Sequence, residues 1–269
     1  MRNWEPYVAH EYTDESVHGS LRVLRSVKSE QLGNERDLFL YLPPSYDRSD
    51  RRYPVIYMHD GQNLFDPKTS FAGEWNVDGI LDQASSEGLE AIVVGIPNMG
   101  PDRCSEYSPF DDPRHGAGNG NAYVAFITDT IKPIVDQDFR SLPEREQTGI
   151  AGSSMGGLIS LYAFFKRADI FGFTGVMSPA LWYGKYSIFD YLDGVTHVGG
   201  RVYVDVGTKE GSRELHDVLD LRDRLIQMGY RSGEDLLYVV DRGGAHNEAA
   251  WARRLGKELR FLLGGAPVG

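Results

Sequence analysis

The chain has 269 residues, of which 41% are hydrophobic and 25% are charged, an ordinary composition for a globular protein. Its 28 basic and 39 acidic residues give a net charge of −11, which argues against nucleic acid or an anionic membrane surface as a partner. The single cysteine, Cys104, excludes an internal disulfide and a cysteine-based zinc site.

The beginning of the chain lacks the basic and apolar regions of a signal peptide, and no apolar run approaches the roughly 18 residues of a transmembrane helix. We therefore expect a cytoplasmic protein. No repeat or low-complexity linker divides the sequence, so we expect a single domain over residues 1–269, with 1–19 as an N-terminal extension.

Short apolar runs predict eight strands. They lie at 20–27, 37–42, 54–59, 91–96, 148–152, 173–177, 201–206 and 235–240. The first two alternate in polarity and are joined through Gly33 and Asn34, which is typical of a hairpin at a sheet edge. The later runs are continuously apolar, as expected of buried parallel strands.

Helical patterns fall between these strands, at 76–87, 121–138, 155–167, 213–228 and 247–263. The second contains Pro133, which should kink it or end it early. The alternation predicts an α/β fold with helices on both faces of a mostly parallel sheet. Residues 97–120 form a long segment rich in Gly, Pro, Asn and Asp, which predicts a functional or mobile loop. The connection 178–200 is short for a large cap domain, so we expect an open site.

The strongest motif is Gly152-Ser153-Ser154-Met155-Gly156-Gly157, which fits G-x-S-x-G. An apolar strand pattern precedes it and a helical pattern follows it, as a nucleophile elbow of the α/β-hydrolase fold requires. This tight turn presents a serine hydroxyl above the sheet, and glycine is needed where a side chain would meet the crossing backbone. The alternative is an ordinary Gly/Ser loop, but the context favours Ser154 as a nucleophile.

A serine nucleophile needs a base, and in this fold the order along the chain is serine, acid, histidine. His246 follows the last predicted strand in a Gly-rich loop, whereas His197 precedes a Gly-Gly turn and His216 lies among charged helical residues. His246 is therefore the expected base. Glu210 follows the strand 201–206 in a turn, at the edge where sites of such sheets form, and is the expected acid. Asp205 is the alternative, although it lies inside the strand.

An oxyanion hole needs two backbone N–H donors. One is expected from Met155, the residue after the nucleophile, and the other from Gln62 in the loop His59-Asp60-Gly61-Gln62. Gly61 should let the chain turn sharply there. His59 and Asp60 lack a third ligand at helical spacing, so no metal site is expected.

These motifs resemble the esterase-D-like branch of the α/β-hydrolases, which includes enterochelin-type siderophore esterases, feruloyl and acetyl-xylan esterases, S-formylglutathione hydrolases and mycolyltransferases. The resemblance spans about residues 20–263. It rests on Tyr41-Leu42-Pro43-Pro44-Ser45-Tyr46, the run from Met58 to Phe65, the elbow, Gly207-Thr208-Lys209-Glu210 and Ala245-His246. It implies the same five site residues, although the acid of this family is often Asp and is Glu210 here.

Four further residues are candidates for substrate contact: Trp75, Trp182, Tyr183 and Arg103. For Arg103, an ion pair with Glu106 that braces the loop is the favoured interpretation. The expected function is a serine carboxylic-ester hydrolase that needs no cofactor and acts on a small-molecule ester. An acyltransferase with the same acyl-enzyme and a non-catalytic binding protein of this fold are the alternatives.

Overall fold

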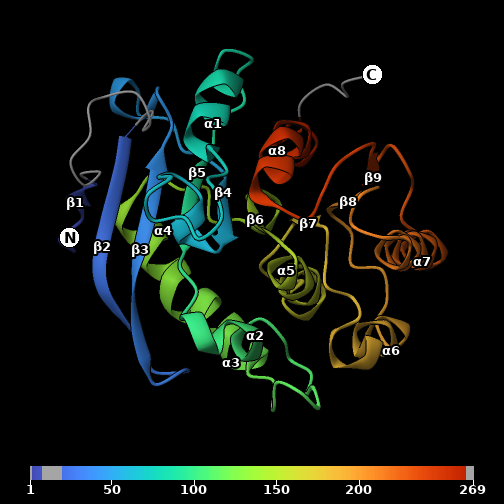
Figure 1. Cartoon of the computed structure of the whole chain (residues 1–269). Coiled ribbons are helices and arrows are strands. Elements are labelled where there is room, and N and C mark those ends of the chain that lie inside the picture. The colour runs from blue at the N-terminus through green and yellow to red at the C-terminus, as the bar shows by residue number, and fades with distance from the viewer. Residues whose placement is uncertain (1, 8–19, 265–269) are drawn as a thin grey trace.

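The computed structural model describes residues 2–7 and 20–264, and within these ranges nine strands form one sheet (Figure 1). The strand order is β1-β2-β3-β5-β4-β6-β7-β8-β9. The strands are β1 (Glu5–Pro6), β2 (Ser20–Ser29), β3 (Asn34–Leu42), β4 (Val55–His59), β5 (Ile92–Ile96), β6 (Thr148–Ser153), β7 (Phe173–Met177), β8 (Arg201–Gly207) and β9 (Leu236–Asp241).

All eight predicted strands are present, and the predicted hairpin is the antiparallel pair β2 and β3. The pair β3–β5 is also antiparallel. The remaining neighbours, in the order β5, β4, β6, β7, β8 and β9, run parallel to one another. The short β1 was not predicted. It pairs with β2 from within the segment expected to be an extension.

The helices are α1 (Val77–Ser85), α2 (Arg103–Glu106), α3 (Gly120–Ala125), α4 (Lys132–Asp138), α5 (Met155–Lys166), α6 (Ser187–Asp193), α7 (Ser212–Met228) and α8 (Glu248–Leu262). The five predicted helical patterns appear, but the second does not end at Pro133. A π-helical segment, Phe126–Ile131, joins α3 to α4 immediately before the proline. This wider turn is a way to pass a residue that lacks an N–H and clashes with the preceding turn.

Alternating side chains along the strands build two hydrophobic cores, one on each face of the sheet. Val55 and Tyr57 belong to the core covered by α3 to α7, whereas Ile56 and Met58 belong to the core covered by α1 and α8. Figure 1 shows α1 and α8 together on one side of the sheet and α5 on the other. The parallel strands therefore have both faces covered and end at a common edge, where loops are free to carry polar groups.

The segments 97–120 and 178–200 are more ordered than expected. The first contains α2 and buries Glu106 and Tyr107, and the second contains α6, which packs Ile188 and Leu192 into the core. Since α6 packs into the core, it does not form a cap over the sheet edge.

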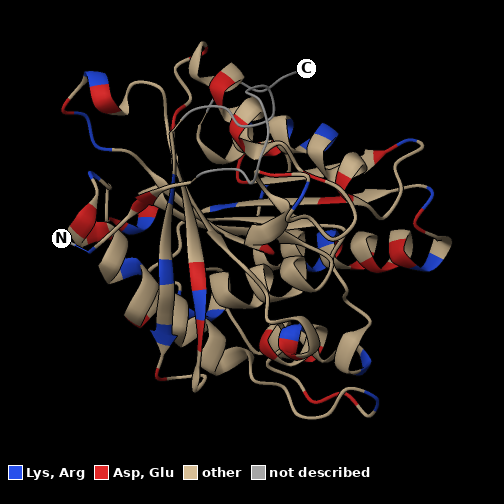
Figure 2. Ribbon diagram, turned by 60° about the vertical axis from the view of Figure 1, so that its left-hand side comes forward, with Lys and Arg blue, Asp and Glu red and all other residues tan. Residues whose placement is uncertain are grey.

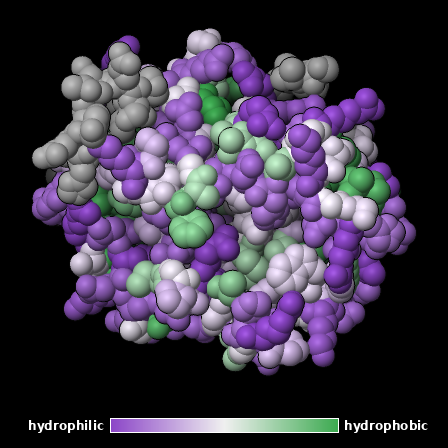
Figure 3. Space-filling view, viewed as in Figure 1, coloured by the Kyte–Doolittle hydropathy of each residue, from purple (hydrophilic) through white to green (hydrophobic). Residues whose placement is uncertain are grey.

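Charged residues of both signs lie mainly on helices, loops and the outer strands, and the central strands carry few (Figure 2). The face in Figure 3 is mostly hydrophilic, with small, separated hydrophobic areas. Among the described residues, none of the helices is long and apolar enough to span a membrane.

Candidate active site

Ser154 occupies a tight turn between β6 and α5, in the position expected for a nucleophile elbow. Its backbone has φ 58° and ψ −121°, a region that a residue with a side chain rarely adopts. Three backbone hydrogen bonds hold the turn, from Ser154 N to Met177 O and from Leu158 N and Ala180 N to Ser154 O. Such a conformation costs about 1–3 kcal/mol and persists only where neighbours enforce it, as they do here.

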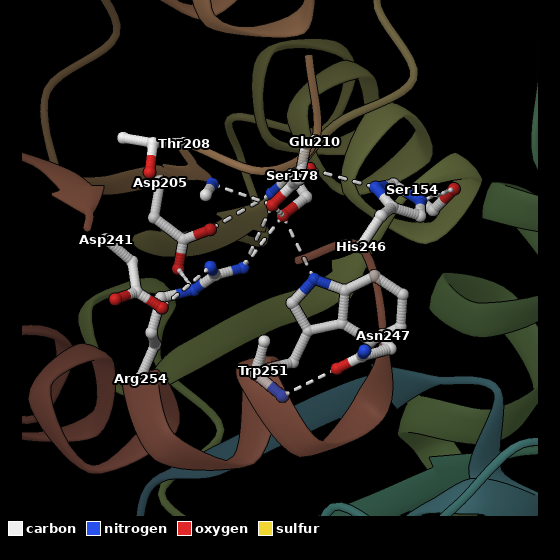
Figure 4. A network of polar contacts seen from close by, with 12 residues as sticks. Ser154, Ser178, Asp205, Thr208, Glu210, Asp241, His246, Asn247, Trp251 and Arg254 are labelled. Atoms are coloured by element: carbon white, nitrogen blue, oxygen red, sulfur yellow. Dashed lines mark hydrogen bonds and ion pairs between the residues drawn. The ribbon is translucent and has the colours of Figure 1, made fainter. Parts of the chain in front are cut away.

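His246 lies in the loop between β9 and α8 and reaches Ser154 from across the sheet edge. Its Nε2 lies 3.0 Å from Ser154 Oγ, and its Nδ1 lies 2.9 Å from Glu210 Oε2 (Figure 4). Because an ionised carboxylate only accepts hydrogen bonds, Nδ1 carries the proton in this arrangement and Nε2 is free to accept one. Asn247 caps the following helix by accepting from Ala250 N, which ends the loop directly after His246.

Glu210 lies in the loop after β8, and its side chain is almost completely buried, whereas 42% of the His246 side chain is exposed. Its Oε1 accepts from Ser178 Oγ and from Gly207 N, each at 2.7 Å. Burial alone would raise the pKa of Glu210, but the hydrogen bonds from His246, Ser178 and Gly207 outweigh it and lower the pKa. The carboxylate is therefore stable in its ionised form.

The loops that carry Glu210 and His246 are joined directly. Thr208 N donates to Asp241 O at 3.0 Å, Lys209 N donates to Gly244 O at 2.8 Å, and Gly243 N donates to Thr208 Oγ1 at 2.9 Å. A Cβ on Gly207 would lie 2.3 Å from Gly244 O, so only glycine permits this close approach.

Asp205, the alternative acid, lies inside β8 and is fully buried. Its carboxylate accepts from Ser178 N and Tyr203 OH and forms an ion pair with Arg254 Nε at 2.9 Å. Burial raises the pKa of Asp205 to about 7, against the opposing influence of Arg254. This side chain makes local contacts and has no contact with His246.

The loop after β4 brings Gln62 to the same edge. Gln62 lies in the 3-10 turn Gly61–Asn63, and its side-chain Oε1 accepts from Asn98 N at 3.2 Å. Met155 is the first residue of α5, where backbone N–H groups have no partner within the helix. The sharp turn is made by Asp60, with φ 54°, and not by Gly61 as expected. Gly61 is instead required by packing, because a Cβ there would lie 2.5 Å from the Gly95 backbone.

Arg103 pairs with Asp60, not with Glu106. Its Nε and Nη2 lie 2.8 Å from the two carboxylate oxygens of Asp60, while Glu106 forms a buried pair with Arg36. Burial would raise the pKa of Asp60, but Arg103 and Asn98 lower it. The expected brace exists with a different partner, because Asp60 faces α2 from the turn before Gln62.

A cleft of about 510 Å³ opens beside Ser154. It is lined mainly by polar and charged residues, with Phe71 and Trp251 as its aromatic members. The lining residues are Asp60, Gln62, Asn63, Phe71, Ala72, Asn98, Gly100, Arg103, Ser153, Ser154, His246, Glu248 and Trp251. Arg103 therefore lies at the cleft as well as pairing with Asp60. The Phe71 side chain is 92% exposed at this rim, which makes it available to a bound molecule.

Three of the predicted substrate contacts do not line this cleft in the described part of the chain. Trp75 is buried against Trp251, with ring centroids 5.6 Å apart, and Tyr183 is buried and stacked on His115. Trp182 packs beside Tyr183 under Arg114. The expectation that Trp75 and Tyr183 rim the site is wrong, because both rings complete the packing beneath their loops.

His59 is buried below the elbow, and its Nδ1 forms a hydrogen bond of 2.8 Å with Tyr123 OH. Burial lowers its pKa to about 3, so the ring is neutral. Within the described residues, no group of three or more His, Cys, Asp or Glu side chains is arranged to hold a metal ion.

Several polar residues at this edge were not found from the sequence. Ser178 directly follows the apolar run of β7, a position comparable to that of Ser154 after β6. Arg254 and Glu258 lie on the buried side of α8 together with Trp251. A charged pair at helical spacing on an apolar stripe is the sequence signal that could have identified them.

Comparisons with known proteins identify a family and related chains. The family model Esterase, described as "Putative esterase", matches residues 29–262. The YbbA protein of Bacillus subtilis is 26% identical over 254 residues, which cover 89% of this chain and 96% of that protein. The iron(III) salmochelin esterase of Escherichia coli is 25% identical over 250 residues, or 86% of this chain and 55% of that protein. The siderophore hydrolase EstA of Aspergillus nidulans shares the fold, with a TM-score of 0.73, 17% identity and coverage of 96% and 99%.

Proposed function

Because the chain belongs to the esterase family and is a carboxylic-ester hydrolase of the α/β-hydrolase fold, we propose that it cleaves its substrate by double displacement through Ser154, His246 and Glu210. The observation that carries this proposal is the position of His246, whose two ring nitrogens lie 3.0 Å from Ser154 Oγ and 2.9 Å from Glu210 Oε2. One imidazole thereby links a strained serine to a buried carboxylate.

In the first step, His246 Nε2 takes the proton from Ser154 as its Oγ attacks the ester carbonyl carbon. The carbonyl oxygen becomes an oxyanion, which the backbone N–H groups of Gln62 and Met155 stabilise. Each such donor is worth roughly 3 kcal/mol in the transition state. The tetrahedral intermediate then expels the alcohol, which receives the proton from His246, and the acyl group remains on Ser154.

In the second step, His246 takes a proton from water, and the resulting hydroxide attacks the acyl carbonyl carbon. Collapse of this intermediate releases the acid and returns the proton to Ser154 Oγ. Glu210 holds Nδ1 protonated and stabilises the imidazolium in both steps. No step needs a cofactor.

The substrate is a small-molecule ester that fits the open cleft beside Ser154. Siderophore esters are the first class to test, since two similar proteins are named for such substrates. Phe71 offers an exposed aromatic surface for an aromatic acyl group, which makes feruloyl esters the second class.

Labelling with a fluorophosphonate, followed by identification of the modified residue, tests the proposal directly. We expect one label per chain, on Ser154. The rate of ester hydrolysis should fall in proportion to the fraction of Ser154 that is labelled. Label on another residue, or hydrolysis that survives full labelling of Ser154, would contradict it. A screen over p-nitrophenyl, feruloyl, acetyl-sugar and triester siderophore substrates then ranks the substrate classes, and product analysis with added alcohols separates hydrolysis from acyl transfer.

A further inference from the structure

Ser178 lies at the carboxyl end of β7, next to the acid of the candidate site (Figure 4). Its backbone has φ 41°, in the left-handed region that favours glycine, although it carries a side chain. Its N–H donates to both the backbone oxygen and the carboxylate Oδ1 of Asp205, at 3.0 and 3.1 Å. The structure thus holds Ser178 in an unfavourable conformation that aims its hydroxyl at Glu210.

The hydroxyl of Ser178 accepts two hydrogen bonds and donates one. Trp251 Nε1 and Arg254 Nη2 lie 3.0 and 2.8 Å from Oγ, and both groups can only donate. They occupy the two lone pairs of the oxygen. The single proton of Ser178 is therefore directed to its remaining partner, Glu210 Oε1, at 2.7 Å.

The same hydrogen bonds determine which carboxylate oxygen of Glu210 faces His246. Its Oε1 accepts from Ser178 and from Gly207 N, so no lone pair of that oxygen is left for a proton or for His246. Its Oε2 is then the oxygen that meets His246 Nδ1. We propose that Ser178 is a positioning residue that keeps Glu210 ionised and holds its Oε2 against His246, an inference that rests on the proposed function.

Arg254 is a buried cation close to Glu210, and the hydroxyl of Ser178 lies between the two. The guanidinium is 3.6 Å from Glu210 Oε1, pairs with Asp205 through Nε at 2.9 Å, and reaches Asp241 through Nη1 at 3.3 Å. A direct two-pronged pair between Arg254 and Glu210 would engage both carboxylate oxygens and draw Oε2 away from His246. Through Ser178, the positive charge stabilises Glu210 while only Oε1 is used.

Three other carboxyl groups lie around Arg254. Asp205 lies on β8, Asp241 ends β9, and Glu258 lies one turn beyond Arg254 on α8. Burial raises the pKa of Glu258 well above its usual range, and the positive charge of Arg254 opposes this shift. Asp205, Asp241 and Glu210 share that charge, and Ser178 connects Glu210 to it.

The test compares Ser178→Ala and Ser178→Gly with the wild type. Glycine accepts a positive φ without strain, so Ser178→Gly keeps the backbone conformation that Ser178→Ala would strain. Without the hydroxyl, the carboxylate of Glu210 loses a donor, so it takes up a proton at a higher pH, and its Oε2 is no longer held against His246 Nδ1. We expect kcat to fall by about 10- to 50-fold with KM within about twofold. We also expect the acid limb of the kcat/KM profile to move upward by about half a pH unit or more.

Thr174→Val is the matched control, because it removes another buried hydroxyl of β7, one that donates to Ile150 O away from the site. Unchanged kcat in both Ser178 variants would overturn the positioning role, and so would an equal fall in kcat and an equal shift of the acid limb in Thr174→Val. Fluorophosphonate labelling of the same samples separates the two levels. If Ser154 is labelled but the pH profile of kcat/KM does not move in the Ser178 variants, this inference alone is refuted. If Ser154 of the wild type is not labelled, the proposed function is refuted and this inference with it.

Discussion

Asp205 and Glu210 lie five positions apart, one inside β8 and one in the loop that follows it, yet only Glu210 contacts His246. Asp205 points into the buried network around Arg254, and Glu210 turns back over the sheet edge. The pair offers a direct comparison of a carboxylate that contacts the base with one buried beneath it.

Glu210→Gln keeps the shape of the side chain but removes its charge and favours the wrong imidazole tautomer. We expect kcat to fall by roughly 10² to 10⁴ with little loss of stability. Asp205→Asn should instead lower the free energy of unfolding by about 1–3 kcal/mol through weaker buried contacts, with kcat of the folded protein largely intact. Steady-state kinetics and urea denaturation check both, and the reverse pattern would transfer the acid role to Asp205.

Ser154→Ala should preserve the fold and lower kcat by a factor on the order of 10⁴ to 10⁶. The strained turn is held by backbone hydrogen bonds, so loss of the hydroxyl leaves it in place. Circular dichroism and hydrolysis of a p-nitrophenyl ester measure the two effects. A variant that keeps more than about a tenth of the wild-type rate would remove Ser154 from the mechanism.

Arg103→Met should destabilise the protein by about 2–4 kcal/mol, because it leaves the carboxylate of Asp60 buried without its cation. The turn that carries Gln62 starts at Asp60, so kcat should fall as well, by about tenfold. The double variant Arg103→Met with Asp60→Asn removes the unpaired charge and should recover part of the stability. Urea denaturation of the single and double variants checks this, and strict additivity would contradict the coupling.

Phe71 and Trp75 lie four residues apart and should respond in opposite ways. Phe71→Ala removes an exposed ring at the cleft, so we expect a higher KM for aromatic esters, by about threefold or more, and an unchanged melting temperature. Trp75→Ala empties a buried site against Trp251 and should cost about 3–5 kcal/mol. Kinetics with aromatic and acetyl esters, together with thermal denaturation, distinguish these outcomes. A KM effect confined to Trp75 would reverse the assignment.

Glu74 should make stability depend on pH. Burial, with the nearby charges of Asp78 and Asp66, raises its pKa to about 7. A carboxyl whose pKa is higher in the folded state binds its proton more tightly there, so stability is lost as pH rises from the unfolded pKa toward 7. Glu74→Gln should match the wild type near pH 4 and exceed it at pH 8 by on the order of 1 kcal/mol, because partial exposure screens the charge. Equal stability at both pH values would contradict this.

The strands and the elbow were predictable because their signals are local. Apolar runs mark β4 to β8, and the glycines around Ser154 reflect a turn that only a few residues can make. The common strand edge follows from parallel topology, which is why Ser154, Glu210 and His246 could be expected to lie near one another.

The features that were missed depend on distant neighbours. Ser178 acquires its contacts only when α8 packs beside β7, and Arg254 is buried because carboxylates from β8 and β9 surround it. The position of its loop predicts Trp75 at the rim, but the sequence does not specify which way a side chain on a loop turns. The ion-pair partner of Arg103 could not be predicted either, since Glu106 is nearer to it in sequence while Asp60 is nearer in space.

The three hydrogen bonds between the loops after β8 and β9 have a consequence for motion. Because Thr208, Lys209 and Gly243 fasten the two loops together, we expect a displacement of the loop that carries the acid to carry the base with it. Such a displacement would keep the carboxylate–imidazole pair intact.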